Sequence, residues 1–442
     1  MSGRKNKKKT IRFLTGVIIF DVIAIIAIAL AFVIFIKPDK KDKKKNTGND
    51  TAFETVEDNG LTEYDTSQTA FDNTDITSEV PNTENTDPAQ SYADEMLAKM
   101  SLHEKVCQMF IITPEAATGY AVVTEAGEKS KQAIMDYPVA GYIYFAQNLS
   151  NTEQTKTMLT NVKQYGMEAN GIPFFTSVDE EGGDVARCAD NLGTTSFNSM
   201  YSYREQGEET AYNNAYTIAS DISNLGFNLD FAPVADTWSN SANTVIGTRA
   251  YSTDYEEAAR LVASATRGFN AGGVVSCIKH FPGHGDTNED SHRSAAYIHK
   301  PLSELMNEDY LPFIAGIEAD TGMIMIGHLY LSDADISSGE DNLPASLSYK
   351  VVTGELRDKL GYNGVVITDS MAMGAIVNYY SSGEAAKLAV KAGVDIILMP
   401  EDFKAAVEAL ESAVQTGEIS EERINESVRR ILVLKYNRLV AQ

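Results

Sequence analysis

The strongest constraint on the fold is a regular alternation that runs through residues 92–442. Short apolar runs rich in β-branched and aromatic residues alternate there with longer amphipathic stretches, as strands alternate with helices. The runs cover residues 109–114, 141–145, 174–179, 227–232, 274–279, 323–328, 364–369 and 394–400. The stretches include residues 150–166, 208–226, 255–272, 303–322 and 382–393, and all of these end in Gly, as helices favour.

Strand–helix alternation implies parallel strand pairing through right-handed crossovers. Eight such units predict an α/β fold of the TIM-like (β/α)₈ barrel type. The alternative is an open doubly wound sheet, which would show a Gly-rich phosphate turn near its first strand. The chain has no such turn, so the barrel is favoured.

Residues 13–36 read FLTGVIIFDVIAIIAIALAFVIFI and carry one charge, Asp21. About 20 apolar residues are enough to cross a bilayer as a helix. A cleaved signal peptide is the alternative, but its apolar part runs only about 7–15 residues. A short N-terminus before a large body favours a basic cytoplasmic segment at 1–12 and a single-pass transmembrane anchor in the cell membrane. We therefore expect the rest of the chain to lie outside the cytoplasm.

The segment at residues 37–91 is predicted to be a disordered linker. After Lys45 it is rich in Asn, Thr, Asp, Glu and Ser, and no Lys or Arg occurs between Lys45 and Lys99. Such a segment buries too little apolar surface to offset the entropy that ordering would cost. One catalytic domain is expected to follow at residues 92–442.

The charge distribution argues against nucleic acid as a partner. The formal net charge is −25, but residues 1–45 hold twelve Lys and Arg against three Asp, a net charge of +9. The remainder therefore carries −34, whereas nucleic-acid binding needs cations that neutralise phosphates. The three cysteines, Cys107, Cys188 and Cys277, have no metal-type spacing and are expected to be buried as small apolar residues.

Polar side chains stand at the ends of five successive apolar runs, where a barrel of this type carries its catalytic groups. Counted from the third run to the seventh, they are Asp179, then Asp236 with the loop residue Arg249, then Lys279 and His280, then His328, and finally Asp369. A charge at the end of one buried strand is common. Polar groups at the ends of five predict an active site.

The segment after the fifth run, residues 279–292, is an irregular loop, because Pro282, Gly283 and Gly285 interrupt regular structure. A metal hydrolase is one interpretation, with ligands drawn from His280, His284, Asp286, Asp290 and His292. However, no helix aligns the His280 and His284 pair, so we expect no metal and no other cofactor. A sugar-binding surface protein without catalysis is a second interpretation.

A glycoside hydrolase is the third interpretation, and it needs a carboxylate and a proton donor on opposite sides of the bond. Asp369 emerges from the apolar Val365-Val366-Ile367 and suits a nucleophile. His292, with Asp290 two residues earlier, suits a loop-borne acid and base, since an imidazole transfers protons both ways near neutral pH.

These residues also resemble a known family. Residues 279–292 resemble the K-H-F-P-G-H-G-D-T-x-x-D-S-H signature of family 3 glycoside hydrolases, in their β-N-acetylglucosaminidase branch. The turn at residues 179–183, the motifs at 229–234 and 246–250, the strand at 366–369 and the last helix at 424–432 are similar to further motifs of that family. The fourteen-residue signature is specific, whereas each of the other motifs alone is weak.

The resemblance implies an exo-acting, retaining β-N-acetylglucosaminidase that removes terminal GlcNAc from cell-wall-derived or other glycans. Asp369 would form a covalent glycosyl-enzyme, and His292, oriented by Asp290, would be the acid and base. Six residues would hold the terminal sugar or line its pocket, with a structural role open for the last two: Asp179, Arg249, Lys279, His280, Arg187 and His328. His284 is expected to hold the loop together rather than to touch substrate.

The chain departs from the family pattern at Asp184, where Arg is usual, at Ser370-Met371 after the nucleophile, and at Ala295-Ala296-Tyr297 after the histidine. None of these changes removes a proposed catalytic group. The alternatives are a β-glucosidase, a glycoside phosphorylase of the same family, or the non-catalytic sugar-binding protein.

Overall fold

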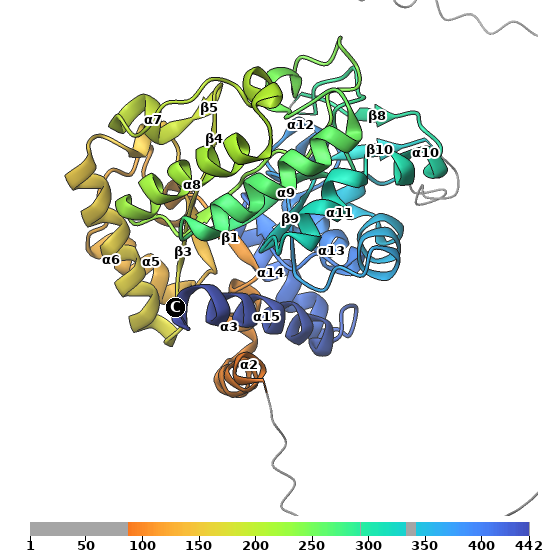
Figure 1. Cartoon of the computed structure of the whole chain (residues 1–442). Helices are drawn as coiled ribbons and strands as arrows, with labels where there is room; N and C mark the ends of the chain where they lie inside the picture. Colours follow the sequence, from red (N-terminus) through yellow and green to blue (C-terminus); the bar gives the residue numbers. More distant parts are fainter. Residues whose placement is uncertain (1–86, 292, 333–341, 442) are drawn as a thin grey trace, which may run out of the picture. The chain divides into compact units, whose positions relative to one another are not determined.

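Eight parallel strands form the centre of the structure, a computed structural model that describes residues 87–291, 293–332 and 342–441 (Figure 1). The strands are β1 (Phe110–Ile112), β2 (Gly141–Ile143), β3 (Phe175–Val178), β6 (Leu229–Asp230), β7 (Val275–Phe281), β9 (Met323–Ile326), β11 (Val365–Thr368) and β12 (Ile397–Leu398). Each strand pairs with the next one along the chain, and β1 pairs with β12. A parallel bridge between Ile367 and Ile396 closes the ring, so the predicted barrel is confirmed.

Seven of the eight predicted apolar runs contain a whole barrel strand, and the run at 274–279 contains all of β7 except His280 and Phe281, which extend the strand into the stretch predicted to be a loop. The runs are apolar throughout because both faces of a parallel sheet are covered. Inside the barrel, alternate residues such as Phe175, Leu229 and Met323 fill the space, and all three are fully buried. The other strand face packs against helices. The three cysteines are free and buried, as predicted.

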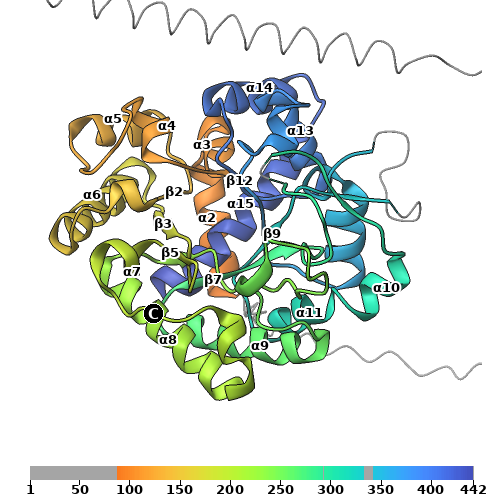
Figure 2. The ribbon, with the colours of Figure 1, turned by 90° about the horizontal axis from the view of Figure 1, so that it is seen from above.

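Helices surround the barrel on the outside (Figure 2). They are α2 (Pro88–Lys99), α3 (Leu102–Cys107), α4 (Pro114–Thr118), α5 (Glu128–Asp136), α6 (Thr152–Asn170), α7 (Arg187–Leu192), α8 (Glu208–Leu225), α9 (Tyr255–Ala271), α10 (Leu302–Asn307), α11 (Leu311–Glu318), α12 (Gly374–Val377), α13 (Ser382–Ala392), α14 (Phe403–Gln415) and α15 (Glu421–Lys435). The side chain of Asp254 caps α9 by accepting the N–H of Glu257 at 2.8 Å, which satisfies one free donor of the first turn.

The prediction of a single helix at residues 303–322 is wrong, because two helices, α10 and α11, occupy that stretch. Glu308 leaves the helical conformation, with φ −128° and ψ −86°. Pro312 then stands in the first turn of α11, where its missing N–H costs no hydrogen bond. The amphipathic pattern continues across the break, so the sequence did not reveal it.

Shorter elements connect these strands and helices. The short helices are η1 (Ala146–Asn148), η2 (Met200–Gln206), η3 (Gly247–Arg249), η5 (Ala345–Leu347), η6 (Lys350–Lys359) and η7 (Tyr436–Val440). Two strand pairs stand outside the barrel: the antiparallel β4 (Glu180–Gly182) and β5 (Val185–Ala186), and the parallel β8 (Ala296–Ile298) and β10 (Leu329–Leu331). Both pairs follow carboxyl ends of barrel strands and lie on the upper side in Figure 1.

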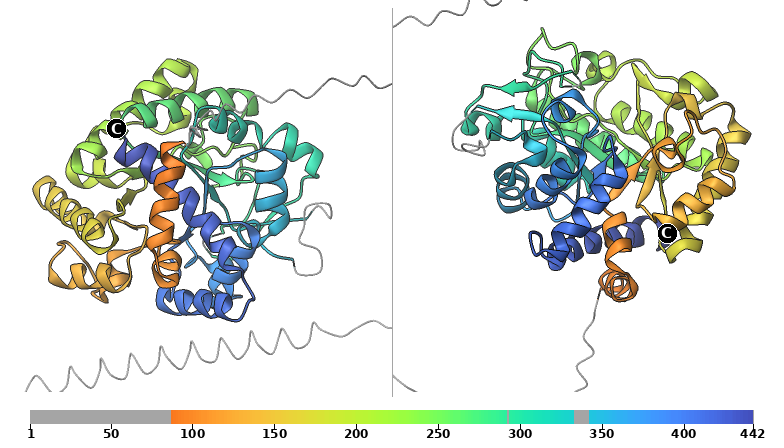
Figure 3. Two further views of the ribbon diagram at one scale, coloured as in Figure 1. Left: turned by 90° about the horizontal axis from the view of Figure 1, so that it is seen from below. Right: turned by 180° about the vertical axis from the view of Figure 1, so that it is seen from behind.

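The opposite end of the barrel is covered by α2 and α15, seen from below in Figure 3. Lys435, at the end of α15, is fully buried there, and its Nζ donates to Oε1 of Gln108 and to the carbonyl of Ala140, both at 2.9 Å. The helix α2 begins at Pro88, inside the stretch assigned to the linker. Its Ala89 and Ala93 are buried, which explains why those residues are ordered.

The predicted anchor at residues 13–36 and the linker up to residue 86 lie outside the described residues. Among the helices of the described ranges, none combines the length and the apolar character needed to cross a bilayer.

Candidate active site

A cavity of about 390 Å³ opens at the carboxyl ends of the barrel strands. The barrel strands β2, β7, β9 and β12, the β4–β5 hairpin, α7, η3 and the residues that follow β2, β3, β11 and β12 supply its wall. The lining residues are Ile143, Phe145, Asp179, Glu181, Val185, Arg187, Arg249, Lys279, His280, Met325, Asp369, Ser370, Met373, Leu398 and Met399. Its volume lies in the range of small-ligand sites, roughly 300–1,000 Å³. The cavity thus gathers six of the nine residues predicted to form the site.

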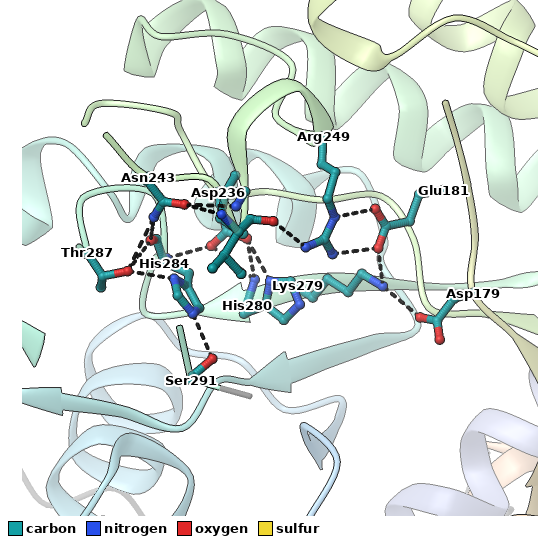
Figure 4. A network of polar contacts seen from close by, with 12 residues as sticks. Asp179, Glu181, Asp236, Asn243, Arg249, Lys279, His280, His284, Thr287 and Ser291 are labelled. Atoms are coloured by element: carbon teal, nitrogen blue, oxygen red, sulfur yellow. Dashed lines mark hydrogen bonds and ion pairs between the residues drawn. The ribbon is translucent and has the colours of Figure 1, made fainter. Parts of the chain in front are cut away.

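Glu181 lies at the centre of a buried charge network in the cavity wall (Figure 4). Its side chain is 2% exposed and accepts hydrogen bonds from Nε and Nη2 of Arg249 at 2.8 and 2.7 Å. Nζ of Lys279 lies 2.6 Å from Oε1 of Glu181 and 2.8 Å from Oδ1 of Asp179. Two cations therefore alternate with two carboxylates, and this pairing compensates for the cost of burying each charge.

The network keeps its members charged. Burial by itself would raise the pKa of Glu181, but Arg249 and Lys279 outweigh it and hold that pKa well below its usual range. Burial would likewise lower the pKa of Lys279, but Asp179 and Glu181 outweigh it and raise that pKa. The cavity wall therefore offers fixed charges that can form charge-assisted hydrogen bonds to hydroxyl groups.

Asp236, fully buried after β6, orients His280. Its Oδ2 lies 2.7 Å from Nδ1 of His280, and its oxygen atoms also accept the backbone N–H groups of His280 and His284. Burial opposes the charge of this carboxylate, but His280 and the other donors outweigh it and lower the pKa of Asp236. Because a carboxylate accepts from Nδ1–H, Nε2 is the ring nitrogen of His280 that is left for the cavity.

His284 holds the following loop together, as predicted. Its Nδ1 lies 2.8 Å from Oγ1 of Thr287 and its Nε2 lies 2.8 Å from Oγ of Ser291. The close packing of this loop also explains Gly285, since a Cβ there would lie 1.7 Å from the carbonyl oxygen of Thr237. Burial lowers the pKa of His284, which favours a neutral ring.

Asp369 follows β11 at the cavity wall. Its backbone N–H donates to the carbonyl of Ile326 on β9 at 2.9 Å, so the neighbouring strand fixes its position. The N–H of Ser370 donates to Oδ1 of Asp369 at 2.7 Å and stabilises the charged carboxylate. A rigidly held carboxylate that lines the same cavity as Lys279 and His280 is suited to act as a nucleophile.

His292, the predicted acid and base, lies outside the described residues. The backbone carbonyl of its neighbour Asp290 accepts the N–H groups of Arg293 and Ser294 at 3.0 and 3.1 Å, and its Oδ2 lies 3.4 Å from Nε of Arg293. Asp290 does not line the cavity. Catalytic contacts are often long before substrate binds, so this geometry leaves the assignment of Asp290 and His292 as a prediction.

Arg187 and His328 have different surroundings. Arg187, the first residue of α7, lines the cavity, and its Nε is buried without a hydrogen-bond partner among the described residues. His328 is fully buried and is not one of the lining residues. Its Nδ1 lies 2.7 Å from Oγ of Ser346, and its Nε2 donates to the carbonyl of Ser370 at 2.9 Å. His328 therefore holds the residue next to Asp369, which fits the structural role that the sequence left open for it.

Two residues of the site were not recognised in the sequence. Glu181 appears there only as part of the Asp-Glu-Glu-Gly-Gly turn, and Asp236 only as the polar end of a run. Their partners, Arg249 and His280, lie 68 and 44 positions away along the chain, so no local pattern links them. Asp184, where the family usually has Arg, accepts the hydroxyl of Thr248 at 2.8 Å. That contact gives the exposed carboxylate a structural partner beside Arg249.

The described members of the proposed metal-ligand set, His280, His284, Asp286 and Asp290, do not come together. Within residues 87–291, 293–332 and 342–441, no three His, Cys, Asp or Glu side chains are grouped so as to hold a metal ion. Both ring nitrogens of His284 are used by Thr287 and Ser291, and Nδ1 of His280 is used by Asp236.

A larger cavity of about 550 Å³ lies at the other end of the barrel, beside α15. Its arginines are paired with carboxylates: Arg429 with Asp94, Arg430 with Asp395 and Arg438 with Asp320. Catalytic groups in such barrels come from the carboxyl ends of strands, so the smaller cavity is the candidate active site.

Residues 101–434 match the family model described as the glycosyl hydrolase family 3 N terminal domain. Beta-hexosaminidase A of Pseudoalteromonas piscicida is 33% identical over 335 residues, which cover 71% of this chain and 56% of that protein. A beta-hexosaminidase of Neisseria gonorrhoeae is 32% identical over 281 residues, which cover 62% of this chain and 74% of that protein.

Solved structures show the same likeness. A glycoside hydrolase family 3 beta-N-acetylglucosaminidase from Paenibacillus sp. str. FPU-7 has a TM-score of 0.72 and 38% identity, covering 78% of this chain and 64% of that one. The beta-N-acetylglucosaminidase from Thermotoga maritima has a TM-score of 0.63 and 26% identity, covering 75% of this chain and 66% of that one. The chain thus spans little more than half of the Pseudoalteromonas protein and under two thirds of the Paenibacillus chain.

Proposed function

Because this chain belongs to glycosyl hydrolase family 3, we propose that it is an exo-acting, retaining β-N-acetylglucosaminidase. The observation that carries the proposal is a single cavity of about 390 Å³ lined by both Asp369 and the Glu181 charge network. A cavity of this size suits one terminal sugar. The two relatives named beta-hexosaminidase and the two beta-N-acetylglucosaminidase structures support the choice of GlcNAc as that sugar.

In the proposed mechanism, the carboxylate of Asp369 attacks the anomeric carbon as the bond to the leaving oxygen breaks. His292, oriented by Asp290, gives a proton to that oxygen and later removes one from the water that releases the sugar. Two displacements at one carbon retain its configuration. The hydrogen bond from the Ser370 N–H keeps Asp369 ready for attack, since it favours the charged form.

The sugar would be held by groups that the structure fixes before substrate binds. Asp179 and Lys279 are already paired at 2.8 Å, and Asp236 orients His280. Arg249 is held on Glu181, and Arg187 also lines the cavity. Groups positioned in advance lose little freedom when a ligand binds, so more of their interaction energy supports catalysis.

The test is to incubate the full chain with aryl β-GlcNAc and aryl β-glucoside. We expect faster cleavage of the GlcNAc compound and first release of the β-anomer of the sugar. Faster glucoside cleavage would contradict the sugar assignment. A strong dependence on added phosphate, with a sugar phosphate as product, would instead support a phosphorylase.

Replacing the nucleophile gives the second test. Asp369→Ala should lower kcat by several orders of magnitude, because the covalent step is lost. Asp358→Ala, which removes an exposed carboxylate of η6, is the matched control and should retain full activity. Near-normal turnover of Asp369→Ala would eliminate it as the nucleophile.

The acid and base can be tested through the leaving group. His292→Ala should slow the cleavage of a GlcNAc disaccharide, whose leaving group needs a proton, far more than that of an activated aryl GlcNAc. Equal losses on the two substrates would argue against an acid role for His292.

The location is a separate proposal that rests on the sequence. Residues 13–36 would anchor the chain in the cell membrane and place residues 92–442 outside the cytoplasm, where cell-wall-derived glycans are available. Extraction of cell membranes with alkaline carbonate should leave the chain in the pellet, and protease added to intact protoplasts should digest it. Release by carbonate, or complete protection from the protease, would contradict this arrangement.

A further inference from the structure

Four tyrosines form an uncharged aromatic surface beside the candidate active site. We call Tyr297 of β8, Tyr330 of β10, and Tyr379 and Tyr380 after α12 the tyrosine platform. The rings of Tyr297 and Tyr330 face each other across the two strands with centroids 5.3 Å apart. Tyr380 is hydrogen-bonded to Tyr330, and Tyr379 is the next residue along the chain.

The platform is open to solvent at its edges. Tyr379 is 58% exposed and Tyr297 is 36% exposed, whereas Tyr330 beneath them is 5% exposed. Ala296 and Ile298, the neighbours of Tyr297, are buried in the core, so Tyr297 is the one side chain of β8 that faces solvent. The ring of His299 lies nearly parallel to that of Tyr297, at 12°. Large aromatic side chains are normally buried, and a group of them at the surface marks a binding site.

The helix α12 connects this platform to the cavity. Met373, which precedes α12, lines the cavity, and Tyr379 follows the helix six residues later. At 1.5 Å per residue the two ends are about 9 Å apart. Figure 1 shows α12, β8 and β10 on the same upper side of the barrel.

Ser291 and Arg293, the residues on either side of the proposed acid and base, both contact α12 or the residue after it. The N–H of Ala375 donates to the carbonyl of Ser291 at 3.4 Å, and Nδ2 of Asn378 donates to the carbonyl of Arg293 at 3.3 Å. In the proposed mechanism, the leaving oxygen takes its proton from the residue between Ser291 and Arg293, so the platform beside α12 is assigned to the leaving-group side of the bond that is cleaved.

We propose that the tyrosine platform binds the sugar units that follow the terminal GlcNAc, so that the preferred substrates are GlcNAc oligosaccharides and not single-sugar glycosides. The inference rests on the proposed function and extends it to the rest of the substrate. Sugar rings present apolar C–H faces that pack on aromatic rings, while hydroxyl groups of sugar and tyrosine remain hydrogen-bonded. The four tyrosine side chains are themselves uncharged, which suits an uncharged oligosaccharide.

The experiment measures kcat/KM of the full chain on aryl β-GlcNAc and on GlcNAc oligomers of two, three and four units. We expect the wild type to gain with oligomer length. Tyr297→Ala and Tyr379→Ala should each lower kcat/KM on the longer oligomers by about tenfold, the scale of one aromatic contact, while aryl β-GlcNAc changes less than about twofold. Tyr297→Trp should retain the gain, because it keeps an aromatic face.

Tyr216→Ala is the matched control, since Tyr216 is 45% exposed on α8 and remote from the platform. Equal losses of kcat/KM on aryl β-GlcNAc and on the oligomers, or an unchanged dependence on oligomer length in both Ala variants, would overturn the role of the tyrosine platform but leave the proposed function standing. Failure of the wild type to cleave any GlcNAc compound would overturn the proposed function and this inference with it. If the Ala variants sediment as a different oligomer while kcat/KM still rises with GlcNAc-oligomer length, the tyrosines contact a second copy of the chain. That result would also overturn the inference.

Discussion

Replacing Glu181 by Gln tests whether the buried charge network organises the active site. The substitution keeps the size of the side chain but removes the only negative charge shared by Lys279 and Arg249 in the described network. Arg249 donates two hydrogen bonds to this carboxylate. A Gln side chain accepts through one oxygen only and presents its own N–H groups to the other donors. One cation is therefore left without adequate compensation.

The expected loss of stability follows from burial. The side chains of Glu181, Lys279 and Arg249 are 2%, 3% and 15% exposed, so solvent screens these ion pairs little. Removing one partner of a buried pair costs about 3–5 kcal/mol, a large part of the roughly 5–15 kcal/mol that stabilises a typical protein. Lys279 and Arg249 would also move toward other acceptors, and a displacement of about 1 Å in a positioning residue can lower a rate about 100-fold.

The assay combines urea unfolding of the full chain with kcat/KM on aryl β-GlcNAc. Glu418→Gln is the matched control, because the Glu418 carboxylate also lies between two cations, Lys387 at 3.0 Å and Lys391 at 2.8 Å. That pair of contacts is exposed, so its loss should leave unfolding and activity as in the wild type. The reasoning would be refuted by a Glu181→Gln protein whose free energy of unfolding is within about 1 kcal/mol of the wild-type value and whose kcat/KM is within about threefold.

Three further predictions concern groups behind the cavity. His328→Phe should lower kcat about tenfold with little change in KM, because the Ser370 carbonyl loses a hydrogen bond; a rise in KM alone would instead indicate substrate contact. Since burial lowers the pKa of His284 below 6.5, the unfolded chain binds more protons just below that pH, and stability falls as the pH falls. His284→Gln should therefore flatten the change in unfolding free energy between about pH 7.5 and 5.5, and an unchanged slope would contradict this. Burial also lowers the pKa of Lys435 well below 10.5, so wild-type stability should rise with pH until the unfolded lysine loses its proton. Lys435→Met should reduce that rise in urea titrations at neutral and at alkaline pH, and equal slopes would show that Lys435 is charged in the folded state.

The fifth apolar run and the loop that follows it divide into parts with different roles. Lys279 and His280 end the run and line the cavity. His284 then ties Thr287 and Ser291 together and sets the position from which the chain continues to His292. In the proposed mechanism, this part of the chain therefore combines a preformed end that binds the sugar with a segment that carries the acid and base.

Much of the architecture is determined by local sequence. A parallel barrel strand is covered on both faces, and so it appears as an uninterrupted apolar run such as Val365-Val366-Ile367. Polar groups at the carboxyl end of the barrel follow such runs directly, and for this reason the sequence places Asp369, Lys279 and His280 at the end of the barrel where the cavity lies. The break between α10 and α11 could not, because an amphipathic pattern records which face is buried and not whether the helix is continuous.

Only the tertiary structure decides which polar side chains meet. Glu181 binds Lys279 and Arg249, and Asp236 orients His280, across distances along the chain that no motif spans. The same applies to His328, for which the sequence leaves a pocket-lining and a structural role open and which the structure buries between Ser346 and the Ser370 carbonyl. Sequence pattern fixes the strand on which a residue lies, because burial repeats locally. The direction and the partner of its side chain depend on how the neighbouring strands and loops pack, and those come from elsewhere in the chain.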